Sequence, residues 1–105
     1  MDKSLNLLGI AKKAGLLAIG ADAVREALGR GSAQIIIAAS DASERSKKQA
    51  HIVVPHTMLE VGAAIGRRPT GVVAILDKGL AEAFKRRSAN EYNVQIQGPP
   101  GRKGF

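Results

Sequence analysis

The side chains that could perform catalysis are few and poorly grouped. His51 and His56 are the two histidines, and their spacing places them on opposite faces of a strand or across a turn, which does not suit a metal pair. Ser40 and Asp41 could join a histidine in a triad, but a Ser-Asp turn that caps a helix is far more common. There is no cysteine, and the glycines match neither a P-loop nor a dinucleotide fingerprint. We therefore expect no enzyme, no metal and no cofactor.

Two loops carry residue types that suit the binding of phosphate. The first joins a short strand to a helix, and the backbone N–H groups and dipole at such a helix start attract anions. Basic side chains flank this loop in the sequence. The candidate residues here are Lys12, Lys13, Gly20, Ala21, Asp22 and Arg25. An ordinary glycine turn beside solvated lysines is the alternative interpretation.

The second loop spans residues 66–71 and leads into an apolar segment. Arg67 and Arg68 stand beside proline and glycine, which favour a semi-rigid loop, and guanidinium groups can pair with phosphates in a bidentate manner. Arginines on a surface need no such partner, so this loop indicates binding only in combination with the first. The candidate residues here are Arg67, Arg68, Thr70, Gly71 and Val72, with Ser40 and Asp41 expected beside the same surface.

The charge of the chain favours a polyanionic partner. Its 105 residues carry a net charge of +7, and the stretch from Lys85 to Phe105 holds five basic residues and one acid. Nucleic acid is the commonest polyanion inside cells, although net charge can also simply maintain solubility. Phe84, Tyr92 and Phe105 are the only aromatic residues, which argues against base stacking on an aromatic platform.

The sequence also indicates where the protein works. Its apolar runs are far shorter than the ~20 residues that a membrane span requires. Lys12 and Lys13 interrupt the early apolar stretch, so a signal peptide is not expected. We therefore expect a cytoplasmic protein without membrane contact, and a monomer when it is free.

Helical and extended patterns alternate along the chain. Helices are expected up to Gly15, over residues 21–30 and 43–50, from the Thr57–Glu60 capping box to Gly66, and from Asp77 to Arg87. Strands are expected over residues 16–19, 34–39, 51–54 and 72–76. This alternation predicts an α/β fold, a three-layer α/β/α sandwich around a mixed sheet of about four strands. We expect one domain over residues 1–88 and a flexible basic tail over residues 89–105.

Four segments together resemble a known family. They are residues 7–15 (LLGIAKKAG), 35–44 (IIIAASDASE), 59–66 (LEVGAAIG) and 73–79 (VAILDKG), which follow in matching order and spacing from about Leu5 to Phe84. They resemble the kink-turn-binding ribosomal protein family of L-seven-Ae and L-thirty-e type, in particular its stand-alone bacterial, YlxQ-like members.

The resemblance implies a non-catalytic protein that binds a kink-turn, an RNA duplex bent sharply at a bulge beside tandem sheared G·A pairs. It implies that the turn into the second helix, residues 20–26, reads the G·A pairs, and that the loop over residues 67–72 covers the bulged nucleotides. Archaeal members carry Asn-Glu and then Lys in the reading helix, where this chain has Asp22, Ala23 and Glu26.

Three functions remain open from the sequence. The first is a structured-RNA binding protein, with ribosomal RNA and the ribosome as possible partners. The second is a protein–protein interaction module on the same fold, because a fold alone does not decide function. The third, the substrate-recognition domain of an RNA methyltransferase, would need a cofactor-binding domain for which 105 residues leave no space.

Overall fold

Helices and strands alternate along the whole described chain. The structure is a computed structural model that describes the backbone of residues 3–92 and the side chains of residues 3–89. The elements in order are α1 (Lys3–Lys13), β1 (Leu17–Ile19), α2 (Ala21–Gly29), β2 (Ile35–Ala38), α3 (Glu44–Gln49), β3 (Ile52–Val53), α4 (Met58–Ala64), β4 (Val72–Ile75) and α5 (Lys78–Tyr92). Every element that the sequence predicts is present, with ends that shift mostly by one or two residues.

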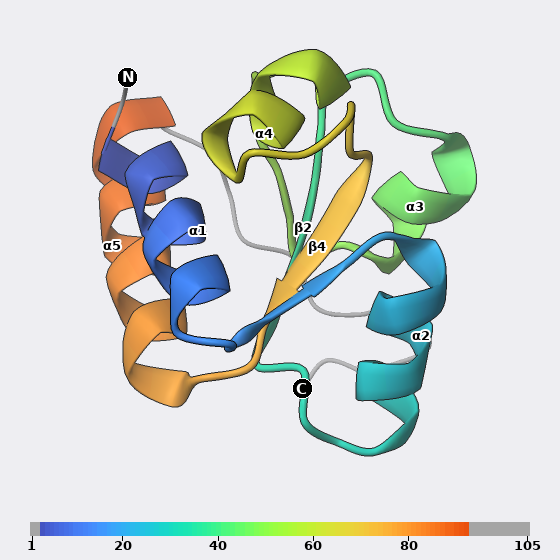
Figure 1. Cartoon of the computed structure of the whole chain (residues 1–105). Helices are drawn as coiled ribbons and strands as arrows, with labels where there is room; N and C mark the ends of the chain where they lie inside the picture. Colours follow the sequence, from blue (N-terminus) through green and yellow to red (C-terminus); the bar gives the residue numbers. More distant parts are fainter. Residues whose placement is uncertain (1–2, 93–105) are drawn as a thin grey trace.

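The four strands form one mixed sheet in the order β1-β4-β2-β3. The β1–β4 and β4–β2 pairs are antiparallel, whereas β2 and β3 are parallel. Helices α1 and α5 pack together on one side of the sheet, with α4 against α1, and α2 and α3 lie on the other side (Figure 1). The predicted three-layer α/β/α sandwich around a mixed sheet is confirmed.

The two central strands form the middle of the core. Every residue of β2 and β4 is buried, as a continuous run of β-branched and small apolar residues predicts for strands covered on both faces. Phe84 on α5 is fully buried and is the largest side chain in this core. Most other core positions are Ala, Val, Ile or Leu, so the layers pack closely without large side chains.

Short polar residues start three of the helices as the sequence indicates. The Ser46 N–H donates to the Ser43 hydroxyl at the start of α3. At α4, the Glu60 N–H donates to Thr57 Oγ1 over 3.2 Å, and the Thr57 N–H donates to Glu60 Oε1 over 2.8 Å. The bond from the Thr57 N–H favours the charged form and lowers the pKa of the exposed Glu60 carboxyl. The Leu80 N–H donates to Asp77 Oδ2 over 2.8 Å at the start of α5.

The last helix is longer than the sequence predicts. Its expected end at Arg87 is wrong, because α5 continues to Tyr92 and Ser88 lies fully buried in its next turn. A polar residue at a core position interrupts the apolar periodicity. The pattern therefore stops at Ser88, although the helix continues. The helix crosses the expected domain boundary after residue 88, and residues 93–105 of the expected tail lie outside the described residues.

Ser88 provides a test of this packing. Among the described side chains, its hydroxyl is buried and has no hydrogen-bond partner. A buried polar group without a partner keeps its desolvation cost, so Ser88→Ala should raise the free energy of unfolding by about 1 kcal/mol. Urea denaturation of both proteins measures this difference. A loss of stability would mean that the hydroxyl has a partner in the folded protein.

Candidate nucleic-acid interface

The pairing of β1 with β4 brings the two candidate loops together. Ile19 lies opposite Val73 at the end of β1, and the Gly20 N–H donates to the Val72 carbonyl oxygen over 2.9 Å. On the other side of β4, the Ala39 N–H donates to the Gly71 carbonyl oxygen over 2.9 Å. The loop over residues 66–71 is therefore anchored between β2 and the turn that starts α2.

The amino terminus of α2 has no side-chain cap. Gly20 occupies the N-cap position with φ 91° and ψ 162°, in the left-handed region that favours glycine, and it has no side chain that could bind the first N–H groups. These groups can therefore bind an external anion, although the Asp22 carboxylate in the first turn offsets part of their positive charge. Asp22, with a side chain 98% exposed, pairs with Arg25 at 3.4 Å on the solvent side of this turn. The turn thus presents N–H donors, a carboxylate and a guanidinium group together.

Backbone contacts with α4 fix the loop over residues 66–71. The Arg67 N–H donates to the Gly62 carbonyl oxygen over 2.8 Å, and the Thr70 N–H donates to that of Met58 over 2.9 Å. The Thr70 hydroxyl donates to the Arg68 carbonyl oxygen over 2.8 Å. These bonds leave the side chains of Arg67 and Arg68 exposed on a backbone that is held in place.

Gly62 makes this close contact possible. A Cβ atom at this position would lie 2.1 Å from the Arg68 carbonyl oxygen and 2.7 Å from its carbonyl carbon. No side chain fits there without moving the backbone of the loop. The glycine in α4 therefore determines where the two arginines stand.

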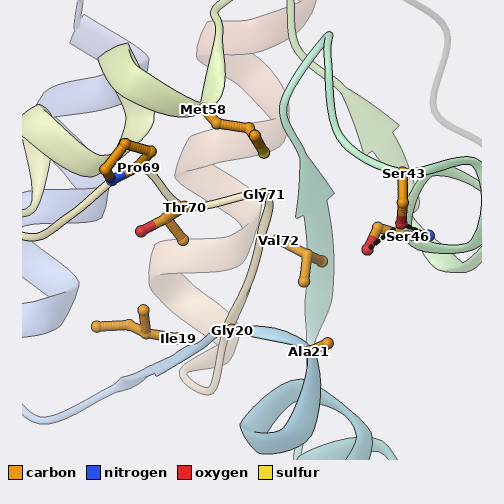
Figure 2. A pocket seen from close by; sticks show the side chains of 10 residues that line it. All are labelled: Ile19, Gly20, Ala21, Ser43, Ser46, Met58, Pro69, Thr70, Gly71 and Val72. Atoms are coloured by element: carbon orange, nitrogen blue, oxygen red, sulfur yellow. Dashed lines mark hydrogen bonds between the residues drawn. The ribbon is translucent and has the colours of Figure 1, made fainter.

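Two adjoining hollows lie between the loops. One of about 290 Å³ has Ser43 and Ser46 of the α3 start on one side and Pro69 and Thr70 on the other (Figure 2). Its lining is Ile19, Gly20, Ala21, Ser43, Ser46, Met58, Pro69, Thr70, Gly71 and Val72. The other, of about 360 Å³, is lined by Ile19, Arg67, Arg68 and Thr70. Donors, hydroxyls and guanidinium groups thus surround an apolar floor, a combination that suits a nucleotide with its phosphate.

The candidate residues occupy different parts of this surface. Thr70 and Val72 are only 7% and 4% exposed, so they form the floor of the hollow. Asp41 Oδ1 accepts a hydrogen bond of 2.8 Å from the Met58 N–H, and the Ser40 N–H donates to the His56 carbonyl oxygen. Ser40 and Asp41 therefore tie the turn after β2 to the start of α4, and neither lines either of these two hollows.

Lys12 and Lys13 stand apart from the two loops. They end α1, and the chain then turns and runs along β1 before it reaches Gly20. At that far end of the β1–β4 pair, the Leu76 N–H donates to the Leu16 carbonyl oxygen. The expected grouping of the two lysines with the phosphate-binding turn is not present in this structure.

Several lining residues escaped the sequence prediction. Ile19, Ser43, Ser46 and Met58 are not charged and belong to three different segments, so only the folded chain groups them. Pro69 could have been predicted as a lining residue, because it lies between the arginines and Thr70 inside the candidate loop.

The structure gives the catalytic alternatives no further support. His51 Nδ1 accepts a hydrogen bond of 2.9 Å from the Ile36 N–H, and His56 lies 3.7 Å from Glu60. Among the side chains of residues 3–89, no three histidine, cysteine or carboxylate groups gather in a way that could hold a metal ion. In the same range, no helix has the length and apolar character to cross a membrane.

The sequence has a curated relative that decides its family. An Enterococcus faecium protein described as "RNA-binding protein YlxQ" is 34% identical over 92 residues, which cover 79% of this chain and 88% of the relative. The chain belongs to the YlxQ family. The predicted membership as a YlxQ-like protein is confirmed. No protein-family model matches the sequence.

Solved structures share the fold of this YlxQ family member. A Bacillus halodurans protein of unknown function is 28% identical and superimposes with a TM-score of 0.74, covering 82% of this chain and 96% of its own. A Giardia lamblia protein described as a 15.5 kD RNA-binding protein is 23% identical, with a TM-score of 0.62 over 81% of this chain and 84% of its own. The second likeness supports the fold alone.

Proposed function

We propose that this protein is a non-catalytic RNA-binding protein that recognises a sharply bent, kink-turn-like RNA. The RNA contacts the uncapped start of α2 and the loop over residues 66–71. The bent RNA places phosphates against the N–H groups that follow Gly20 in the first turn of α2 and against Arg67 and Arg68, while an unstacked nucleotide enters the hollow between them.

One observation carries this proposal. The Gly20–Val72 hydrogen bond joins two segments that are about fifty residues apart in the sequence. The anion-binding start of α2 and the loop over residues 66–71, the arginine loop, therefore form a single surface. The YlxQ relative described as an RNA-binding protein supports RNA as the partner. A bent RNA suits this surface better than a straight duplex, because the hollow can accept a base only after it leaves the stack.

The selectivity of binding tests the proposal. A gel-shift titration should compare an RNA with a kink-turn and a matched RNA in which Watson–Crick pairs replace the sheared G·A pairs. We expect the kink-turn RNA to bind at least tenfold more tightly. Equal affinity for both RNAs would contradict recognition of the bend.

The salt dependence of binding tests the phosphate contacts. The α2 start and the arginine loop suggest about five phosphate contacts, for which log K should fall with log[salt] at a slope of roughly −4. Fluorescence titrations at a series of KCl concentrations measure this slope. A slope near zero would show that phosphates do not supply the affinity.

We further propose that the protein acts as a monomer in the cytoplasm, in association with the ribosome. Its natural target is then a structured segment of ribosomal RNA. Sedimentation of a cell lysate on a sucrose gradient tests this association, and we expect the protein in the ribosomal fractions at low salt. Recovery only at the top of the gradient would contradict it.

A further inference from the structure

The two helical sides of the sheet carry unequal charge. Over residues 3–13 of α1 and 78–89 of α5 there are seven basic residues and one acid. Helices α2 and α3 carry four basic residues and three acids. The positive charge of the described chain is therefore concentrated on the side formed by α1 and α5.

Ion pairs sharpen this difference. On the α2–α3 side, Asp22, Glu26 and Glu44 each lie within 4 Å of a cation. Within α1 and the described side chains of α5, the one acid, Glu82, lies 3.6 Å from Lys85. Six exposed cations remain there without an ion-pair partner among the described residues, namely Lys3, Lys12, Lys13, Lys78, Arg86 and Arg87.

These six cations, the α1–α5 cations, belong to two helices that pack side by side (Figure 1). The Leu76 N–H donates to the Leu16 carbonyl oxygen, so the end of α1 and the start of α5 lie at the same end of the β1–β4 pair. The helices consequently run antiparallel, which places Lys12 and Lys13 at the same end as Lys78. At ~1.5 Å per residue, α1 and α5 extend for roughly 16 to 22 Å.

Helix stability does not explain this placement. Lys3 and Lys78 are the first residues of their helices, where a cation meets the positive end of the helix dipole. The Asp77 carboxylate caps α5 and offsets this repulsion at Lys78, whereas the described part of α1 has no acid in its first turn. Only Lys12 and Lys13, at the end of α1, are favourably placed for the dipole. Lys3 therefore stands at a helix start without a compensating acid among the described residues.

We propose that the α1–α5 cations form a second RNA-binding surface that contacts the phosphates of double-stranded RNA. This inference rests on the proposed function, since it takes RNA as the partner. The surface offers charge without rings for stacking, because Phe84, the one aromatic side chain described on these helices, is fully buried. Such a surface suits the backbone of a duplex better than the bases of a single strand. The protein can then hold two RNA segments at once. One lies at the paired loops, which are the turn into α2 and the loop over residues 66–71, and the other lies on α1 and α5.

A triple variant on α5 alone tests the second surface. The full chain and its Lys78→Gln, Arg86→Gln, Arg87→Gln variant should be titrated with a straight 20-base-pair RNA duplex and with a short kink-turn RNA. We expect Kd for the duplex to rise at least tenfold and the salt slope to weaken by about 2 to 3. Kd for the kink-turn RNA should change by less than twofold.

A matched variant removes the same charge from the other side. This triple variant carries Arg30→Gln, Arg45→Gln and Lys48→Gln, and it should change Kd for the duplex by less than twofold. Circular dichroism melting verifies that both triple variants fold. Lys12→Gln with Lys13→Gln gives a second test of the surface on α1, and it too should weaken duplex binding.

Three results would overturn the second surface. They are unchanged duplex binding by the α5 variant, equal loss in the matched variant, and competition by polyglutamate that equals competition by duplex RNA at the same charge concentration. Failure of the kink-turn RNA to bind the natural protein would instead refute the paired loops as its site. The duplex titration would still report on the α1–α5 cations.

Discussion

Gly62→Ala is expected to lower the free energy of unfolding by about 3 kcal/mol and to weaken binding of kink-turn RNA at least tenfold. The added Cβ would lie 2.1 Å from the Arg68 carbonyl oxygen, and backbone cannot move aside as the end of a flexible side chain can. The loop must shift away from α4, which moves both arginines relative to Gly20. Urea denaturation measures the stability, and a gel shift at a temperature where the variant is folded measures the binding.

Gly29→Ala is the matched control for this substitution. Gly29 also lies in a helix, but a Cβ there would meet nothing within 4 Å. Alanine favours a helix over glycine, so this variant should be at least as stable as the natural protein and should bind RNA normally. If Gly62→Ala behaved in the same way, the close contact between α4 and the arginine loop would be refuted.

Asp22→Ala is expected to weaken binding of kink-turn RNA by about 1–3 kcal/mol, by analogy with contacts to base edges in duplexes. The side chain is almost fully exposed at the α2 start, where its carboxylate can accept hydrogen bonds from a sheared guanine. On charge alone the opposite should happen, because removal of an acid frees Arg25 from its ion pair. The sign of the change therefore separates base reading from electrostatic attraction.

Two further titrations complete the Asp22 test. The loss should disappear with an RNA in which Watson–Crick pairs replace the G·A pairs, since that RNA offers no sheared guanine. Arg67→Ala should weaken both RNAs to a similar extent, because phosphate contacts carry no sequence information. Tighter binding of kink-turn RNA by Asp22→Ala would rule out the guanine contact.

Local signals explain how much of this fold could be predicted. The Thr57–Glu60 capping box and Asp77 mark helix starts that depend on residues three positions apart, and the structure contains both. Unbroken apolar runs in the sequence predict the buried strands β2 and β4. The length of α5 could not be read in this way, because Ser88 is polar yet lies in the core.

The candidate site was only partly predictable, because its assembly depends on tertiary contacts. Arg67 and Gly20 could be recognised separately as phosphate-binding types, but the β1–β4 register that joins their loops has no signature in the sequence. Only six residues separate Lys13 from Gly20 in the sequence, which predicts that the two lie close together. An extended strand rises about 3.3 Å per residue, so β1 carries the chain away from the end of α1. The role of Gly62 depends on a contact with a loop that only the folded chain brings near.

Backbone amide signals of the natural protein test the central claim most directly. Two-dimensional NMR spectra of the ¹⁵N-labelled full chain should be recorded with and without a short kink-turn RNA. The amides of Ala21, Asp22, Arg68, Thr70 and Gly71 should show the largest changes, because they lie at the α2 start and on the arginine loop. If the largest changes fell elsewhere, with these five amides unaffected at saturation, the RNA would not bind where the two loops meet.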